Sequence, residues 1–284
     1  MPSREIIRRD FDSIGEYVDR AARPVDYFRN NSHTSQATER PEFHGTPTFE
    51  DALDLARSGW TDGREYIAKL AERLNGRLSA LVSVPEVRYD VTGDFLDIGR
   101  FVSDEPEDFG TLVDTQVRVD APVAKIVRMR ISTGARFSVA PSSYFIRGAA
   151  AIALADVLER KGCRVEIMAY TRSESYSDHI STYTYPLKHE NQPLDIDACA
   201  FFLAHISSHR RINFANREQE SEHDRKLMDV PGAYGKSQSL PEAEKGDIHL
   251  GALVENWTEQ QAFDWIVSQL RSQGIEVEGD EVRI

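Results

Sequence analysis

The chain has 284 residues, of which 40% are hydrophobic and 29% are charged, and its net charge at pH 7 is −13. This composition is typical of a globular protein with enough apolar residues for a sizeable core. The negative net charge argues against a protein that binds nucleic acid through its overall electrostatic field, although it does not exclude a local basic patch. No run approaches the ~20 apolar residues of a membrane span.

The cellular setting follows from two further features. The opening residues MPSREIIRRDFD lack the apolar core of a signal peptide. Cys163 and Cys199 are the only cysteines, and each lies inside an apolar stretch, which is typical of reduced cysteines in an intracellular protein. We therefore expect a cytoplasmic protein that does not enter membranes.

The first 80 residues read as a helical region. Residues 3–22 place apolar side chains at helical spacing, which predicts one helix; these are Ile6, Ile7, Phe11, Ile14, Tyr17 and Val18. Thr48 and Asp51 have the spacing of a capping box and predict a second helix that ends near Gly59.

Residues 81–284 are expected to form an α/β domain. Between residues 82 and 120, short alternating runs predict short strands, and we expect residues 111–119 to pair beside the central strand. The centre is residues 125–171: a strand through Val127, Met129 and Ile131, a loop rich in Ser, Thr and Gly, a long helix, and a second strand. Two strands joined by such a helix should be parallel.

The rest of the domain is less regular. Residues 180–187 alternate as a third strand would, and residues 228–246 are predicted to form an irregular arm. Thr258 and Gln261 form a second capping box, and the helix that it opens should run to Gly274, with an edge strand after it. The predicted fold is α/β, with a mixed, mainly parallel sheet flanked by helices and preceded by the N-terminal helical region.

The central unit resembles the opening of a von Willebrand factor A domain. That family carries D-x-S-x-S after its first strand, and the Asp and the two Ser hydroxyls hold a divalent metal. Here the equivalent run is Ile131-Ser132-Thr133-Gly134-Ala135, which has no Asp. A hard cation wants a carboxylate among its oxygen ligands, so the resemblance implies a degenerate A-type domain without its metal site. The whole chain also resembles an uncharacterised family from phage and mobile-element genomes, through GTPTFEDALDLARSGW, DVTGDFLDIGRF and RGAAAIALADVLERKGCRVEIMAY.

Polar side chains follow the central strand, where α/β folds place their ligands. Ser132, Thr133 and Ser138 lie at the expected carboxyl end of this strand. Arginines at Arg136, Arg147, Arg210 and Arg211 provide groups that bind a phosphate or a partner's carboxylate. These seven residues are the candidate binding site.

Motifs for catalysis are absent from the sequence. His205 and His209 stand at i and i+4, a spacing that binds one metal on a helix, but no third ligand aligns with them. The chain has no G-x-S-x-G, no Walker A and no G-x-G-x-x-G. We therefore expect no metal and no cofactor.

Three functions remain open from the sequence. The first is a non-enzymatic binding or assembly protein of phage or mobile-element origin that contacts a protein partner. The second is a metal- or phosphate-dependent enzyme that uses the loop at residues 132–143. The third is a nucleic-acid-associated accessory protein, which the net charge disfavours.

Overall fold

The main sheet of the protein is mixed and mostly parallel, as the sequence predicts. A computed structural model describes residues 4–24, 34–65, 67–69, 72, 86–90, 95–96, 100, 109–113 and 125–275. The sheet contains six strands: β1 (Arg4–Asp10), β5 (Ile126–Ser132), β6 (Arg164–Glu174), β7 (His179–Lys188), β8 (Lys236–Ser237) and β9 (Ile248–Leu250). Their order is β1-β7-β6-β5-β9, with β8 beside β6. The pairs β1/β7, β5/β6 and β5/β9 are parallel, whereas β7 and β8 are antiparallel to β6.

The predicted central unit is confirmed. Strands β5 and β6 pair in parallel from Ile126 to Ser132, and helix α6 (Pro141–Arg160) connects them. Proline at the first helical position fits the start of α6, and Gly162, with φ of +83°, follows its end. The small residues of α6 let neighbouring backbone approach closely. A Cβ atom on Gly148 would lie 2.1 Å from the carbonyl oxygen of Leu203.

The prediction of one helix over residues 3–22 is wrong in its first half. Residues Arg4–Asp10 form the edge strand β1, which pairs in parallel with β7, and only Ile14–Ala21 are helical (α1). The apolar residues Ile7 and Phe11 are buried in the core, so the same residues satisfy both patterns. Pairing with a strand about 170 residues away decides between them, and local spacing cannot reveal it.

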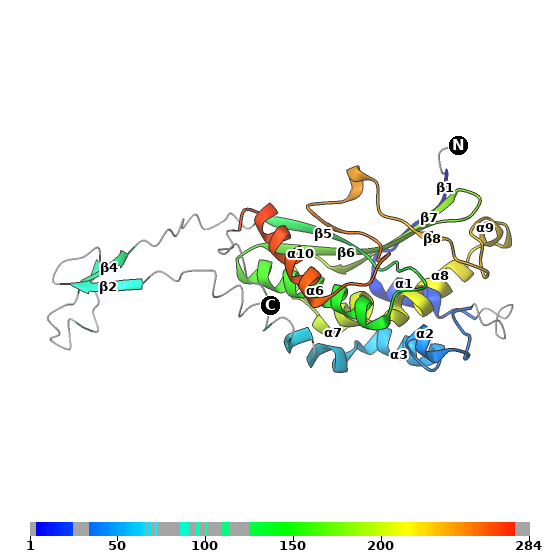
Figure 1. Cartoon of the computed structure of the whole chain (residues 1–284), viewed down its shortest axis with the longest axis horizontal. Helices are drawn as coiled ribbons and strands as arrows, with labels where there is room; N and C mark the ends of the chain where they lie inside the picture. Colours follow the sequence, from blue (N-terminus) through cyan, green and yellow to red (C-terminus); the bar gives the residue numbers. More distant parts are fainter. Residues whose placement is uncertain are drawn as a thin grey trace.

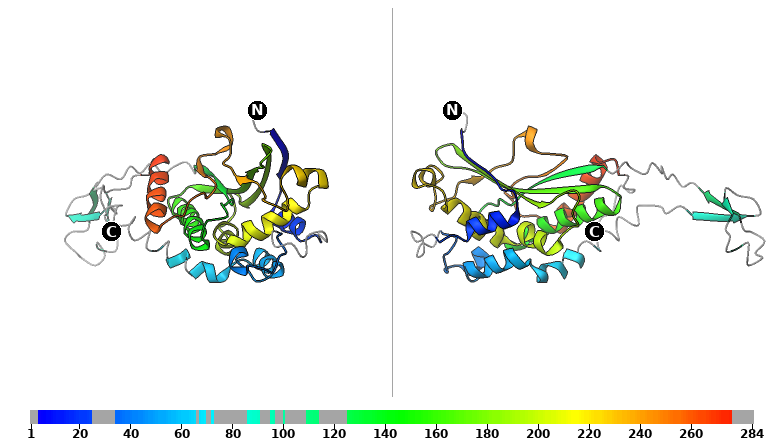
Figure 2. Two further views of the ribbon diagram at one scale, coloured as in Figure 1. Left: turned by 45° about the vertical axis from the view of Figure 1, so that its right-hand side comes forward. Right: turned by 180° about the vertical axis from the view of Figure 1, so that it is seen from behind.

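Helices cover one face of the sheet. Val127, Met129 and Ile131 of β5 are buried toward this face, and Figures 1 and 2 show the helices gathered on it. Besides α1 and α6, the elements are α2 (Pro41–His44), α3 (Phe49–Ser58), α7 (Ile196–Cys199), the π-helical segments η2 (Ala200–Ala204) and η3 (Ser208–Asn213), α8 (Phe214–Glu218), α9 (Glu222–Leu227) and α10 (Glu259–Ser272). Residues 61–65 and 67–69 are also helical.

Both predicted capping boxes are confirmed. The hydroxyl of Thr48 accepts from the backbone N–H of Asp51 at the start of α3, and Thr258 and Gln261 cap α10 in the same way. Each pair satisfies backbone donors that the first helical turn leaves free. The strand expected after Gly274 falls almost wholly on residues outside the described ranges.

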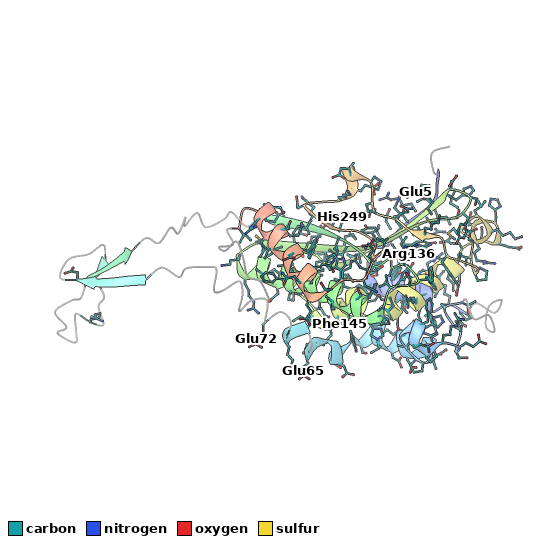
Figure 3. The ribbon with its side chains drawn as sticks, viewed as in Figure 1. Glu5, Glu65, Glu72, Arg136, Phe145 and His249 are labelled. Carbon is teal, nitrogen blue, oxygen red and sulfur yellow. The ribbon has the colours of Figure 1, made fainter. Side chains whose placement is uncertain are left out.

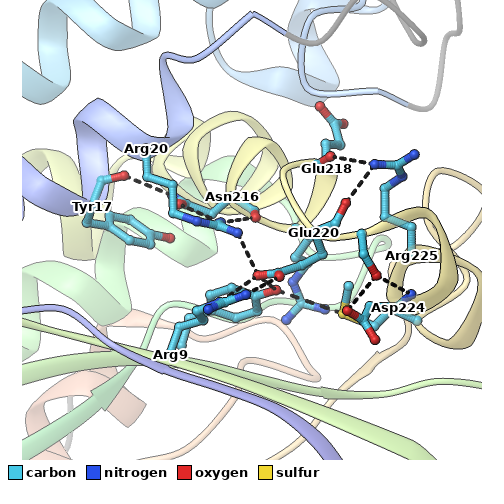
Figure 4. Close-up of polar contacts among 12 residues, drawn as sticks. Arg9, Tyr17, Arg20, Asn216, Glu218, Glu220, Asp224 and Arg225 are labelled. Atoms are coloured by element: carbon cyan, nitrogen blue, oxygen red, sulfur yellow. Dashed lines mark hydrogen bonds and ion pairs between the residues drawn. The ribbon is translucent and has the colours of Figure 1, made fainter.

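A buried carboxylate joins the N-terminal region to the helical layer. Glu220, which follows α8, is 3% exposed. Its oxygens accept hydrogen bonds from Arg9 of β1 at 2.6 Å and from Arg20 of α1 at 2.7 Å. The hydroxyl of Tyr183 donates to it as well, at 3.1 Å, and Figure 4 shows the two arginines converging on this residue. Two cations thus neutralise one buried anion.

The opposite face of the sheet is crossed by residues 236–250, which we call the arch. The arch overlaps the predicted arm at residues 228–246 and contains the short 3₁₀ helix η4 (Glu242–Glu244). Strand β8 anchors one end on β6, and β9 anchors the other end on β5. In Figure 1 the arch rises from the sheet on the side away from α6.

Three short strands form a separate antiparallel sheet. They are β2 (Glu86–Asp90), β3 (Phe95–Leu96) and β4 (Phe109–Val113), in the order β2-β4-β3. Short strands are therefore confirmed here, but the expected pairing of residues 111–119 beside the central strand is wrong for residues 111–113, because β4 pairs with β2 and β3. The described neighbours of β5 are β6 and β9. Within the described ranges, no helix has the length and apolar character needed to cross a membrane.

Candidate functional site: the strand-end loop

The loop between β5 and α6 is where the sequence predicts a ligand, but its two leading hydroxyls are buried. Ser132 is 1% exposed, and its Oγ accepts from the backbone N–H of Gly134 at 3.1 Å. Thr133 is fully buried, and its hydroxyl donates to the carbonyl oxygen of Tyr170 at 3.3 Å. Both side chains thus hold the loop against the sheet instead of facing solvent.

Arg147 points from α6 to the same strand end and is also buried. Its guanidinium donates to the carbonyl oxygen of Ser132 at 2.8 Å, to that of Leu250 at 3.3 Å, and to that of Gly251. These bonds join the ends of the adjacent parallel strands β5 and β9. Arg147 thus holds two strand ends together, and its guanidinium is not at the surface, where the predicted ligand would bind.

Arg210 and Arg211 of η3 are clamps of the same kind. Arg210 is 2% exposed and donates to carbonyl oxygens of Phe43 at 2.8 Å and of Phe137 and Val139 at 3.1 Å. Arg211 is fully buried and donates to Ser35, Ala37, Thr46 and Pro47. Neither guanidinium faces solvent, whereas binding a phosphate, the role predicted for both arginines, needs an accessible guanidinium.

These buried cations have no carboxylate partner among the described residues, so carbonyl dipoles compensate their charge. Burial lowers the pKa of Arg147, of Arg210 and of Arg211 to about 10 in each case. Arg217 of α8 lies nearby, is fully buried, and donates to the carbonyl oxygen of Tyr234 at 2.9 Å. The strand end is thus strongly electropositive inside the protein, which disfavours a divalent cation there.

The two candidate metal-ligating histidines do not share one helical turn. His205 ends η2 in an extended conformation, with φ of −98° and ψ of 123°, and η3 begins only at Ser208. The ring of His205 packs edge-on to Trp60, at a centroid distance of 4.6 Å. Burial lowers the pKa of His205 to about 4.

His209 instead belongs to the strand-end loop. Its Nδ1 lies 3.0 Å from the side-chain amide nitrogen (Nδ2) of Asn213, and its Nε2 lies 3.2 Å from the backbone carbonyl oxygen of Ala135. Burial, helped by the charges of Arg210, Arg217 and Arg147, lowers the pKa of His209 to about 3. The part of the chain that the structure describes contains no group of three or more His, Cys, Asp or Glu placed to hold a metal.

The outer tip of the loop is exposed and carries a residue that the sequence reading missed. Arg136 and Ser138 are exposed, as a surface site requires, and between them Phe137 is 77% exposed. Leu253 pairs with this loop through two backbone hydrogen bonds, which brings the neighbouring Val254, 51% exposed, alongside it. We call Arg136, Phe137, Ser138 and Val254 the strand-end surface; Figure 3 labels Arg136. The sequence did carry a signal for this surface, because Phe137 is a large apolar residue within a run of turn-forming residues.

The structure therefore separates the predicted site into two parts. Arg136 and Ser138 lie on the strand-end surface, whereas Ser132, Thr133, Arg147, Arg210 and Arg211 lie beneath it. A family model described as "Domain of unknown function (DUF7192)" matches residues 3–277. No curated protein and no solved structure matches the chain.

Proposed function

Because the chain belongs to the DUF7192 family, a domain of unknown function, we propose its function from geometry: it is a non-enzymatic binding or assembly protein. Its strand-end surface contacts a protein partner. The observation that carries this proposal is Phe137, a large aromatic side chain that is 77% exposed at the tip of a folded loop. Aromatic residues are enriched at the centres of protein interfaces because they bury much area at little entropic cost.

The loop that displays Phe137 is fixed from below. Arg210 donates to the carbonyl oxygens of Phe137 and Val139, and the backbone N–H of Arg136 donates to Leu253 at 2.8 Å. A surface held in one conformation loses little conformational entropy when a partner binds, so more of the contact energy appears as affinity. The buried arginines thus support binding indirectly, by shaping the loop.

The two alternative functions receive less support from the described residues. An enzyme that uses the loop would need polar groups facing its substrate, but Ser132 and Thr133 are buried and hydrogen-bonded to backbone. A nucleic-acid protein would need Arg210 and Arg211 at the surface, where they would meet phosphates, yet both are 2% exposed or less.

We further propose that the sheet is a degenerate A-type domain from a phage or mobile element, acting in the cytoplasm. The β5–α6–β6 unit, its Ser- and Thr-containing loop and the lack of an Asp in residues 131–135 support the first part. The origin rests on the sequence resemblance alone. Both cysteines are free, in keeping with a reducing compartment.

Site-specific photo-cross-linking tests the proposed interface. A photoreactive phenylalanine analogue at position 137 should give one discrete protein adduct in cells that make the protein naturally, and mass spectrometry identifies the partner. The same analogue at Tyr176, which is 72% exposed in another loop, is the matched control. Failure to form an adduct at 137, or identical adducts at both positions, would contradict the proposal.

A further inference from the structure

The open face of the main sheet holds a cavity that is separate from the strand-end surface. It has a volume of about 430 Å³ and lies between the sheet and the arch. Its walls come from four strands and from the roof: Arg8, Asp10, Arg128, Arg130, Met168, Tyr170, Thr184, Leu240, Ala243, Glu244 and Gly246. This volume falls within the roughly 300–1,000 Å³ of small-molecule sites.

The roof of this cavity is pinned at three places. The backbone N–H of Gln238 donates to Arg172 at 2.8 Å, and that of Asp247 donates to the carbonyl oxygen of Arg128 at 2.9 Å. Between these anchors, Arg8 of β1 binds the carboxylate of Glu244 at 2.8 Å. Gly246, at φ of +70°, passes so near the sheet that a Cβ atom would meet the carbonyl oxygen of Arg128 at 2.8 Å. The arch is therefore fixed against the sheet by these contacts.

The two ends of the cavity differ in charge. At the β1 end, Arg8 contacts the carboxylates of both Glu244 and Asp10, so two negative groups surround one positive group there. At the β5 end, Arg128 and Arg130 stand two residues apart on one face of the strand. An anionic group is favoured at the β5 end, and hydrogen-bond donors are favoured at the β1 end.

Among the described residues, the guanidinium of Arg128 forms no ion pair. The carboxylate of Asp247 is bonded instead to the backbone N–H of Arg128, at 2.8 Å. Arg130 binds Glu166 at 2.6 Å through one of its nitrogen atoms, and no described residue is bonded to the other N–H groups of its guanidinium, which can bind a ligand. Two such groups side by side suit the oxygens of a phosphate or a carboxylate.

The floor between the two ends is mainly uncharged. Met168 is half-buried, and the hydroxyl of Tyr170 lies 2.7 Å from Nε2 of His249. Figure 3 shows His249 on the arch side of the sheet, opposite Phe145 of α6. Burial and the charge of Lys245 lower the pKa of His249 to about 4, so this pair is neutral at pH 7. The uncharged part of a ligand can therefore pack against this part of the sheet.

We propose that the cavity under the arch binds a small molecule with one phosphate or carboxylate group. The anionic group binds Arg128 and Arg130, and hydroxyl or amino groups of the ligand face Asp10 and Glu244. This site is independent of the proposed function, because it uses the open face of the sheet and none of the residues of the strand-end surface.

Calorimetric titration with three sugars tests the proposal. Glucosamine 6-phosphate carries a phosphate, glucuronate carries a carboxylate, and glucosamine carries no anion. At least one anionic sugar should bind with a dissociation constant below about 10 mM, whereas glucosamine should not. The stronger of the two identifies the preferred anion. Absence of binding by both anionic sugars at that concentration, or equal binding of glucosamine, overturns the proposal.

Two variants place the binding in this cavity. Arg128→Gln should weaken binding by about tenfold or more, which is the loss expected for a charge-assisted contact. Arg136→Gln, which alters an exposed arginine of the strand-end surface, should leave it unchanged. Ala243→Trp adds a large side chain to the roof and should also abolish binding, while circular dichroism checks that each variant is folded. Unchanged affinity in Arg128→Gln or in Ala243→Trp contradicts the assigned place.

Discussion

Nε2 of His209 lies 3.2 Å from the carbonyl oxygen of Ala135, so the π-helical segment η3 is bonded directly to the strand-end loop. The amide nitrogen of Asn213 is the donor to Nδ1, which leaves the proton of the neutral ring on Nε2. A histidine so arranged donates to backbone and is not open to a metal. The loop between β5 and α6, which has no Asp in residues 131–135, is thus held in place by His209 from the distant segment η3.

Replacing His209 should cost stability and leave metal content unchanged. His209→Ala removes the hydrogen bond to Ala135 and leaves a space in a buried position, which should lower the free energy of unfolding by about 2–3 kcal/mol. Urea unfolding measures this loss, and elemental analysis is done on the same samples. A stoichiometric divalent metal in the parent protein that is lost in His209→Ala would contradict the structural role.

Acid should destabilise the protein beginning near pH 6.5. Burial lowers the pKa of His209 to about 3, below the ordinary value of 6.5, so the unfolded chain takes up a proton before the folded protein does. The stabilising contribution is therefore complete above pH 6.5 and is lost as the pH falls toward 3. His209 alone should account for about 2 kcal/mol between pH 7 and pH 5.

Urea midpoints at pH 7 and pH 5 measure this effect. The pKa of His44, which is buried, and that of His205, which is half-buried, shift in the same direction, each lowered to about 4 by removal from water. Glu218 opposes them, because burial raises its pKa. His209→Gln should give a shallower pH dependence than the parent protein. Equal midpoints at both pH values in the parent protein would refute the expectation.

Arg211 should not tolerate lysine. Its guanidinium donates to four carbonyl oxygens in residues 35–47, a geometry that a single ammonium group cannot reproduce. Arg211→Lys should lower the free energy of unfolding by about 3 kcal/mol because carbonyl groups are left unpaired. Hydrogen exchange should also become faster around residues 35–47. The exposed Arg136→Lys is the control and should change neither quantity; comparable effects in both variants would show that the buried bonds are unimportant.

Gly148 and Gly15 should respond oppositely to alanine. At Gly148 the added Cβ would meet the carbonyl oxygen of Leu203 at 2.1 Å, so α6 and η2 would have to separate. We expect a loss of about 3 kcal/mol or more, measured by urea unfolding. At Gly15 in α1 the nearest atom is 3.7 Å away, and alanine should stabilise the helix by about 0.5–1 kcal/mol. A folded Gly148→Ala protein of parent stability would show that the two segments separate easily.

The parts of the fold that depend on neighbouring residues follow from the sequence. The capping boxes at Thr48 and Thr258 and the β5–α6–β6 unit are each encoded within one continuous stretch. Strand β1 was not predictable in this way, because Ile6, Ile7, Phe11 and Ile14 satisfy helical spacing and only β7 makes residues 4–10 a strand. Its partner is too distant in sequence to be seen in a local pattern.

The candidate site was predicted less well because charge is a poor guide to burial in this protein. Arginine is rarely fully buried without a partner, so Arg147, Arg210 and Arg211 read as surface residues. The structure surrounds them with carbonyl oxygens from segments far apart in the chain, an arrangement that no spacing rule describes. The cavity under the arch likewise combines β1, β5, β6, β7 and the roof.

The pairing of β1 with β7 has a consequence for the order in which the protein forms during synthesis. The edge strand β1 emerges from the ribosome before its partner, which spans His179–Lys188, and before its buried anion, Glu220. At about 5–20 residues per second, β1 waits roughly 10–40 seconds for these residues. During that interval its apolar residues Ile7 and Phe11 have no sheet to join. We therefore expect strand β1 to need protection by a chaperone until β7 has been made.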